Sequence, residues 1–360
     1  MAYTTIDDPS AHFHIQLHTG TGSTQTVTND ANAGDFKPDL IWVKNRDDTD
    51  SHMLSDSNRG STKALTSQDD IAEFTPTNGD LAFLTDGYSF GSNNNYNRSS
   101  DKFVAWQWKA NGGTATATGS ESGDNPAYSA QANQTAGFSI ITYTGTGAEG
   151  DVTHGLGGKP DWIITKNRDE GSDSNWVVWH KDMVDADADN GAYAYLNTNG
   201  EDQATSVFYE GDAISNTVVA FKGGNQNTNK DTIKYVMYCF RSIQGYSKFG
   251  AYKGNGNADG TFVYTGFQPA WLMVKRVDST GEWLIYDNKR DLFNLRDTRL
   301  EAQDNFADST GTTKVFDFLS NGFKCKGSDT DINADGGRYI YMAFAEHPFV
   351  SSRGVPTTAR

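Results

Sequence analysis

Two short motifs have the residue types of catalytic or phosphate-binding sites. Gly87–Gly91 reads G-x-S-x-G, which presents a nucleophilic serine when it forms a turn between a strand and a helix. Gly145–Gly150 reads G-x-G-x-x-G, which binds a pyrophosphate where it opens a helix. Neither motif is followed by a helical pattern, and related segments of the chain lack the serine or the third glycine. We interpret both as turns, so the sequence predicts no catalytic residue and no enzyme.

Two acidic loops carry oxygen ligands at the close spacing of calcium sites. The candidate ligands are Asp185, Asp187 and Asp189 in the first loop and Asp329, Asp331 and Asp335 in the second. The first begins like an EF-hand loop, but Leu196 stands where that loop needs its bidentate acid. His12, His14 and His18 alternate as on one strand face, which we interpret as polar and exposed. We therefore expect no metal and no cofactor, with Ca²⁺ at either loop as the alternative.

Tryptophans and carboxylates provide the remaining candidates for ligand chemistry. Aromatic rings stack on sugars, and Trp106, Trp108, Trp176 and Trp179 lie on strands where one ring could face outward. We take these four as candidate ligand-binding residues, the alternative being that they fill the core. Among 46 acidic residues some pair could have glycosidase spacing, but the sequence selects none.

Composition limits the fold class and the partners. The 360 residues include 37 glycines and 44 aromatic residues, and mean hydropathy is -0.64, which is typical of an all-β protein with many turns. The net charge of -16 opposes binding to nucleic acid or to anionic membranes. We find no membrane-spanning apolar run and expect no secretory signal. Two cysteines cannot staple a chain of this size, so we expect buried thiols and a reducing cytoplasm.

A threefold repeat organises the chain. Each copy has a G-x-G turn, then a proline-led strand, a second strand, and an aromatic closing strand. The prolines stand at Pro38, Pro160 and Pro269, so each repeat has the size of a domain. Each proline-led strand is apolar on both faces, as in the middle of a sandwich, and its final lysine is expected to mark the exit to solvent.

These patterns predict three tandem β-sandwich domains of jelly-roll type, each of about 100 residues. We place repeat 1 at 12–110, repeat 2 at 137–243 and repeat 3 at 246–349. Residues 1–11 are expected to form an N-terminal attachment segment and residues 350–360 a C-terminal tail. Residues 111–136 are rich in small polar residues, which predicts a flexible linker.

Five segments carry a resemblance to a known family. They are Ala2–Ser10, Lys37–Arg46, Phe103–Gly113, Gly245–Gly250 and Met342–Arg360. Through them the whole chain resembles a family of marine-phage virion proteins described as structural or tail-fibre-like. The resemblance implies repeats similar to concanavalin A-like lectin sandwiches. The motifs are specific for the family and much less so for a role, so no site residue is carried over.

The resemblance implies a non-enzymatic structural protein on the virion surface, assembled in the host cytoplasm. The expected role is that of a tail-fibre-like adhesin that recognises a host-surface glycan. The alternatives are a capsid decoration protein, such as a head fibre or cement protein, and a polysaccharide depolymerase. The expected partners are other virion proteins of the tail or capsid, host polysaccharide and further copies of the chain. Nucleic acid and membrane insertion are not expected.

Overall fold

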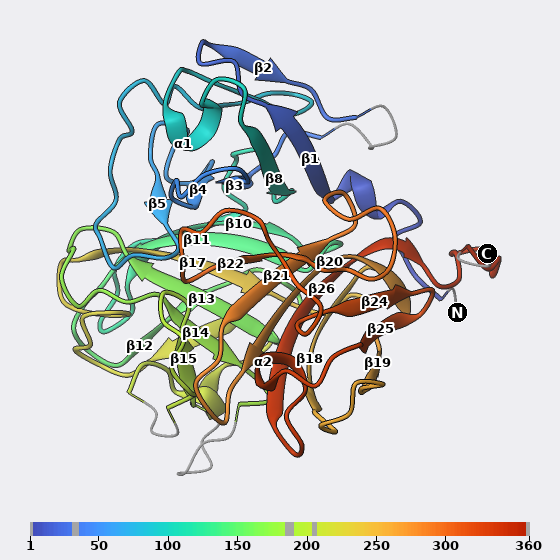
Figure 1. Ribbon diagram of the computed structural model, residues 1–360. Coiled ribbons are helices and arrows are strands. Elements are labelled where there is room, and N and C mark those ends of the chain that lie inside the picture. Colours follow the sequence, from blue (N-terminus) through green and yellow to red (C-terminus); the bar gives the residue numbers. More distant parts are fainter. Residues whose placement is uncertain (1–2, 31–35, 184–190, 204–206, 358–360) are drawn as a thin grey trace.

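The computed structural model describes residues 3–30, 36–183, 191–203 and 207–357 (Figure 1). Strands make up 41% of the chain and helices 4%, and every strand pairing is antiparallel. The prediction of an all-β sandwich protein is confirmed. The described part contains no helix that is both long enough and apolar enough to cross a membrane.

Repeat 1 forms a five-stranded sheet in the order β1-β8-β3-β4-β5 and a three-stranded sheet in the order β2-β7-β6. The large sheet contains β1 (Phe13–Thr19), β8 (Lys102–Trp108), β3 (Leu40–Asn45), β4 (Met53–Asp56) and β5 (Leu65–Thr66). The small sheet contains β2 (Gln25–Val27), β7 (Tyr88–Phe90) and β6 (Ala82–Phe83). Short helices are η1 (Pro9–Ala11) and α1 (Asn94–Asn97).

Repeat 2 forms a seven-stranded sheet in the order β15-β14-β13-β17-β11-β10-β9 and a pair, β12-β16. The large sheet contains β15 (Tyr193–Tyr195), β14 (Val177–His180), β13 (Trp162–Asn167), β17 (Lys234–Phe240), β11 (Phe138–Thr144), β10 (Ala127–Asn133) and β9 (Ala117–Gly119). The pair is β12 (Gly150–Thr153) and β16 (Val218–Phe221), and η2 (Gly211–Ala213) precedes β16.

Repeat 3 forms a six-stranded sheet in the order β18-β26-β20-β21-β22-β23 and a three-stranded sheet in the order β19-β25-β24. The large sheet contains β18 (Ser247–Lys253), β26 (Arg338–Pro348), β20 (Phe267–Arg276), β21 (Trp283–Asp287), β22 (Thr298–Glu301) and β23 (Ser309–Thr310). The small sheet contains β19 (Phe262–Tyr264), β25 (Gly322–Cys325) and β24 (Phe316–Leu319), and α2 (Thr330–Asn333) precedes β26.

The three large sheets share one strand order. In each, the opening strand pairs with the closing strand, which pairs with the proline-led strand, which pairs with the second strand. The proline-led strand is covered on both faces, as the sequence predicts. In β3, Ile41 and Val43 face a core enclosed by the small sheet of repeat 1, whereas Leu40 and Trp42 face the opposite way.

That opposite face belongs to a core common to all three repeats. One cluster of buried residues takes members from β1, β3 and β8, from β11, β13 and β17, and from β18, β20 and β26. Aromatic rings meet across the repeat boundaries: Phe13 stacks on Phe344 at 4.7 Å, and Trp162 meets Trp283 edge to face at 6.0 Å. Burial of this apolar area holds the three sheets together. The count of three separate domains stays a prediction, since one core joins the units.

Equivalent backbone hydrogen bonds link the repeats in a closed cycle. The amide of Glu73 in repeat 1 donates to Arg168 O in repeat 2, at 2.8 Å. The amide of Asp202 donates to Val277 O in repeat 3, and that of Asp308 to Arg46 O in repeat 1, each at 2.8 Å. The acceptors are equivalent positions after the proline-led strands. The repeats therefore form a pseudo-threefold ring.

The segment predicted as a flexible linker contains ordered strands, so that prediction is wrong. β9 and β10 lengthen the large sheet of repeat 2, where β10 pairs with β11 over its whole length. Asn58 of repeat 1 also donates to Ser129 O at 2.9 Å. Small alanine, serine and threonine side chains occur both in flexible linkers and in closely packed edge strands. Composition alone therefore could not distinguish these two structures for residues 111–136.

The first and last described segments of the chain lie close to each other beside repeat 3 (Figure 1). Tyr3 Oη donates to Gly266 O at 2.8 Å, and Thr4 Oγ1 donates to Gln244 O at 2.8 Å. In the C-terminal tail, the amide of Ser352 donates to the Asp7 carboxylate at 2.6 Å. The N-terminal segment thus packs on repeat 3, and its role in attachment stays a prediction.

Candidate binding cleft

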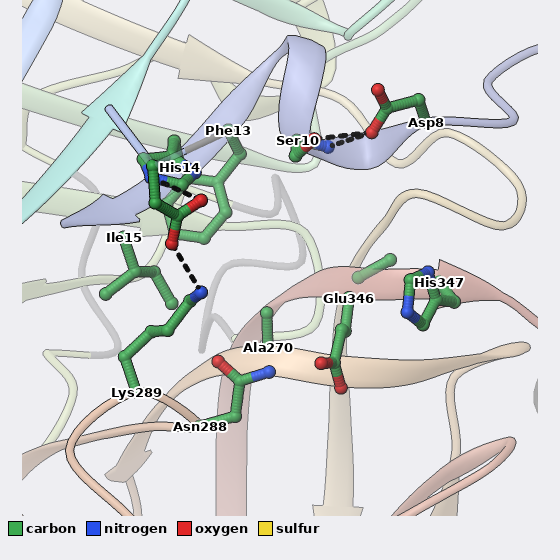
Figure 2. Close-up of a pocket in the computed structure, with 12 residues that line it drawn as sticks. Asp8, Ser10, Phe13, His14, Ile15, Ala270, Asn288, Lys289, Glu346 and His347 are labelled. Carbon is green, nitrogen blue, oxygen red and sulfur yellow. Dashed lines mark hydrogen bonds and ion pairs between the residues drawn. The ribbon is translucent and has the colours of Figure 1, made fainter. Parts of the chain in front are cut away.

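A cleft of about 380 Å³ lies between repeat 1 and repeat 3, and we call it the 1–3 cleft (Figure 2). Repeat 1 provides one wall from β1, from the segment around η1 and from Asp30, three residues after β2. Repeat 3 provides the other from β20, β26 and the turn after β21. The lining residues are Asp8, Ser10, Phe13, His14, Ile15, Asp30, Ala270, Asn288, Lys289, Ala345, Glu346 and His347.

The floor of the 1–3 cleft is apolar and rigid. Phe13, Ile15 and Ala270 are buried members of the common core, and Phe13 contacts both Trp108 and Phe344. Their packing fixes the backbone of β1 and β20, from which the polar side chains of the cleft project. A preformed apolar floor with a few placed polar groups is the usual construction of a small-molecule site.

An ion pair closes one side of the 1–3 cleft across the repeat boundary. Lys289 Nζ binds Asp30 at 2.9 Å, and Asp30 also lies 3.9 Å from His14 Nε2 (Figure 2). Burial lowers the pKa of His14 below 6.5, despite the opposing charge of Asp30. The interpretation of the His14 position as exposed is wrong, because its side chain is buried beside Gln16 and Asp30 of the same repeat.

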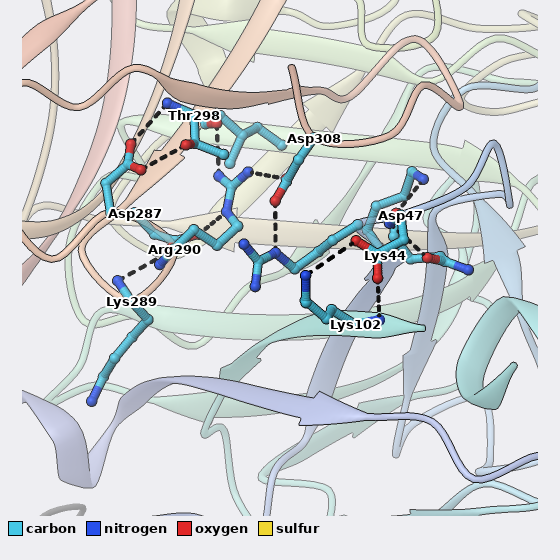
Figure 3. Close-up of polar contacts among 12 residues, drawn as sticks. Lys44, Asp47, Lys102, Asp287, Lys289, Arg290, Thr298 and Asp308 are labelled. Carbon is cyan, nitrogen blue, oxygen red and sulfur yellow. Dashed lines mark hydrogen bonds and ion pairs between the residues drawn. The ribbon is translucent and has the colours of Figure 1, made fainter. Parts of the chain in front are cut away.

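A salt-bridge network holds the turn that carries Asn288 and Lys289 (Figure 3). Asp287 accepts hydrogen bonds from the amides of Lys289 and Arg290, at 3.1 and 2.8 Å, and from Arg290 Nε at 2.6 Å. Arg290 also binds Asp308, which binds Arg46 of repeat 1 at 2.7 Å. Burial alone would lower the pKa of Arg290, but the carboxylates of Asp287 and Asp308 raise it above its usual value. The network thus fixes the repeat 3 wall against repeat 1.

The polar groups of the cleft both donate and accept hydrogen bonds. Glu346 is half-buried and His347 exposed, and neither side chain has a hydrogen-bond partner in the part of the chain described. Asn288 is buried, and its Oδ1 has no hydrogen-bond partner among the described residues. At the rim, Asp8 accepts from the amide and the hydroxyl of Ser10, at 3.0 and 2.5 Å. Carboxylates and amides beside a lysine and a histidine, over an apolar floor, suit a ligand rich in hydroxyl groups.

The four candidate tryptophans are not at the surface. Trp106, Trp108 and Trp176 lie in the common core, and Trp179 lies in the core of repeat 2. Trp106 Nε1 donates to Asp287 of repeat 3 at 3.2 Å, and Trp176 Nε1 donates to Thr66 O of repeat 1 at 2.8 Å. The prediction of an outward-facing ring at these positions is wrong, because both faces of these strands are covered.

The calcium candidates of the second acidic loop serve the fold. Asp329 caps α2 by accepting from the amide of Asp331 at 3.0 Å, and Asp331 binds Lys314. Asp335 lies in the turn that follows α2. Asp185, Asp187 and Asp189 lie outside the described residues. Among the residues described, no three histidine, cysteine, aspartate or glutamate side chains gather as metal ligands would.

The lysines that end the proline-led strands are also buried. Lys44, Lys166 and Lys275 donate to the carbonyl of the following residue. Lys166 and Lys275 also reach a carbonyl of a neighbouring repeat, whereas Lys44 donates to Asp48 O of its own repeat. Lys166, for example, reaches Asp70 O of repeat 1 at 3.2 Å. Burial lowers its pKa to about 7. The expectation that these lysines mark an exit to solvent is wrong, because the ring covers them.

Sequence reasoning missed the 1–3 cleft because its walls are more than 200 residues apart in the chain. One usable signal exists in the repeats. Asp56 and Arg59 in repeat 1 stand at the same spacing as Asp287 and Arg290 in repeat 3, and both pairs form buried salt bridges. This shared pair marks the turn that bears Asn288 and Lys289.

Comparison with known families places the chain in one of them. Residues 8–348 match the family described as a domain of unknown function, DUF7483, and the chain belongs to this family. No curated protein and no solved structure shows significant similarity to the chain.

Proposed function

We propose that this DUF7483 protein is a non-enzymatic structural protein of the phage virion surface that recognises a host-surface glycan in the 1–3 cleft. The observation that carries the glycan proposal is the cleft itself, with hydrogen-bond donors and acceptors over a fixed apolar floor. The virion proposal rests on the sequence resemblance described above. Assembly in the host cytoplasm and further copies of the chain as partners belong to the same proposal.

The ring supports this role because it holds both walls of the cleft in place. The Lys289–Asp30 pair and the Arg46–Asp308 pair each join repeat 1 to repeat 3. A site that is fixed before binding loses little conformational freedom when the ligand enters. Hydrogen bonds from glycan hydroxyl groups contribute little net affinity, because they replace hydrogen bonds with water. A preorganised site partly offsets this small gain.

The glycan proposal is tested with purified host-surface polysaccharide and the Glu346→Gln variant. Glu346 makes no hydrogen bond within the described chain, and only its charge acts on the buried Arg296, so the variant should shift the thermal unfolding midpoint only slightly. A charged hydrogen bond contributes about 1.5–3 kcal/mol, so we expect binding to weaken by about tenfold or more. The matched control is Glu121→Gln, an exposed carboxylate outside the cleft. Equal binding by both variants and the native protein would refute a glycan site in the 1–3 cleft.

The virion proposal is tested by electron microscopy of intact particles labelled with an antibody to this chain. Label at the tail supports the adhesin role. Particles without label, in a preparation where the antibody binds the purified protein, would refute a surface position. Release of reducing ends from the polysaccharide by the intact protein would refute the non-enzymatic role and favour a depolymerase.

Capsid decoration is the second candidate, and the pseudo-threefold ring favours it. Three equivalent units around one axis match the symmetry of a threefold position on a shell, where each unit could meet an equivalent surface. In the labelling experiment this role predicts antibody distributed over the head.

A further inference from the structure

One loop of repeat 3 exposes an apolar cluster. Leu292, Phe293 and Leu295 lie between β21 and β22, and we call them the 292–295 loop cluster. Leu292 is 70% exposed and Phe293 80% exposed, the largest values among the exposed apolar side chains of the described residues. Single exposed leucines are ordinary on protein surfaces, but three large apolar side chains within four residues mark an interaction site.

The exposure of this cluster does not come from a loose loop. Asn294 exchanges two hydrogen bonds with the backbone of Phe318 on β24, each at 2.9 Å. Asp291 accepts from the amides of Asp297 and Thr298 at 2.9 and 2.8 Å, which closes the base of the loop. Fixed backbone contacts hold the apolar side chains outward, so little order has to be gained on binding.

The fold itself does not require apolar residues at this position. The equivalent loop of repeat 1 follows Arg59 with Gly60, Ser61, Thr62 and Lys63, all polar or small. Both loops follow the same Asp-x-x-Arg turn and its buried salt bridge. The equivalent loop of repeat 1 thus folds without the large apolar side chains that repeat 3 exposes.

Charge indicates what kind of surface fits the cluster. Asp297 and Asp317 flank it. The charge of Arg296 acts on Asp317, but neither carboxylate lies in a salt bridge within the described chain. The one guanidinium in the loop, Arg296, is buried over the Phe318 ring. A symmetric contact with a second copy would bring two Asp297 and two Asp317 carboxylates together, so like charges disfavour self-association at this cluster. A sugar is also a poor fit, because leucine side chains offer no hydrogen bonds to hydroxyl groups.

We propose that the 292–295 loop cluster is a docking surface for another virion protein that presents an apolar pocket rimmed by lysine or arginine. This proposal rests on the proposed function, since it assigns the contact that attaches the chain to the particle. Leu292 and Phe293 enter the pocket, and Asp297 and Asp317 pair with its basic rim. Such an anchor of apolar side chains inside a charged rim is the usual anatomy of a specific interface.

The test uses phage that lack this chain, grown on cells that supply the native protein or a variant in limiting amount. Copies per purified particle are counted by quantitative mass spectrometry. We expect Phe293→Ser to reduce the copy number by about tenfold or more, as the loss of one buried aromatic anchor would. The matched control is Phe306→Ser, an exposed phenylalanine in the connection between β22 and β23, which should leave the copy number unchanged.

Each outcome of this experiment decides a different point. Native copy number with Phe293→Ser, in a variant that unfolds at the native temperature, would overturn the docking surface. Unchanged copy number together with weaker binding of host polysaccharide would also overturn it and assign the cluster to a glycan. Absence of the native protein from the particles would overturn the proposed function and, with it, the docking surface. A second variant, Asp297→Asn with Asp317→Asn, should lower attachment and make it less sensitive to salt.

Discussion

Glu73 joins repeat 1 to repeat 2, and its neutralisation should weaken the whole ring. Its carboxylate binds Arg168 of repeat 2 through two hydrogen bonds of 2.9 Å and Arg59 of repeat 1 at 3.0 Å. Arg59 is fully buried and keeps a second partner, Asp56, at 2.5 Å. Glu73→Gln preserves the shape of the side chain but removes its charge, which leaves both guanidinium groups short of a partner.

We expect Glu73→Gln to lower the free energy of unfolding by about 3 kcal/mol. Breaking a buried ion pair from one side costs about 3–5 kcal/mol, and the lower end applies here because Arg59 retains Asp56. Denaturant unfolding at pH 7 measures this loss, with the exposed Glu121→Gln as the control. A loss no larger than about 0.5 kcal/mol, the usual size of a surface effect, would refute the reasoning.

The pH dependence provides a second check on the same variant. Burial by itself would raise the pKa of Glu73, but the hydrogen bonds from Arg168 and the charge of Arg59 lower it below 4.5. A lowered carboxylate pKa stabilises the fold fully above 4.5, and this stabilisation is lost as the pH falls through the folded-state pKa. The difference between the native protein and Glu73→Gln should therefore shrink below pH 4.5. A difference that stays constant on acidification would contradict the assignment to an ion pair.

Three further predictions concern groups inside the ring. Trp176→Ala should lower the free energy of unfolding by about 3–5 kcal/mol in denaturant titrations, because its buried ring and its bond to Thr66 O are both lost. Burial lowers the pKa of Lys166 to about 7 in the folded chain, from 10.5 in the unfolded chain. Between these two values the unfolded chain binds more protons, so the free energy of unfolding should rise with pH. Denaturant unfolding at a series of pH values should show this rise in the native protein and not in the Lys166→Met variant. Burial raises the pKa of the Cys325 thiol to about 12 and also raises that of Cys239. Both thiols should resist a chromogenic disulfide reagent in the native protein and react once the protein is unfolded. The absorbance of the coloured thiolate that the reagent releases measures this reaction.

The strands within each repeat could be predicted from the sequence, because local residue patterns encode them. Runs that are apolar on both strand faces after Pro38, Pro160 and Pro269 predicted central strands, and β3, β13 and β20 lie inside each large sheet. Period-two alternation determines which residues share a face. It does not say what covers that face, so Trp106 and Lys44 could be read as near solvent although the ring buries both.

The closure of the ring could not be predicted, because it depends on contacts between distant segments. Asp308 and Arg46 are 262 residues apart in the chain, and neither shows a local pattern that names the other. The 1–3 cleft depends on the same closure, since Asp30 and Lys289 meet only after repeat 3 returns to repeat 1. The candidate site is thus a property of the assembled ring.

Hydrogen exchange of three backbone amides tests the closed ring most directly. The amides of Glu73, Asp202 and Asp308 each bond to a carbonyl of the next repeat, and all three lie in connecting segments between strands. In a closed ring with one core, these amides should exchange as slowly as those of β3, β13 and β20. Rapid exchange of the three amides, at the rate of open loops while the strands stay protected, would contradict the account and favour three units that move independently.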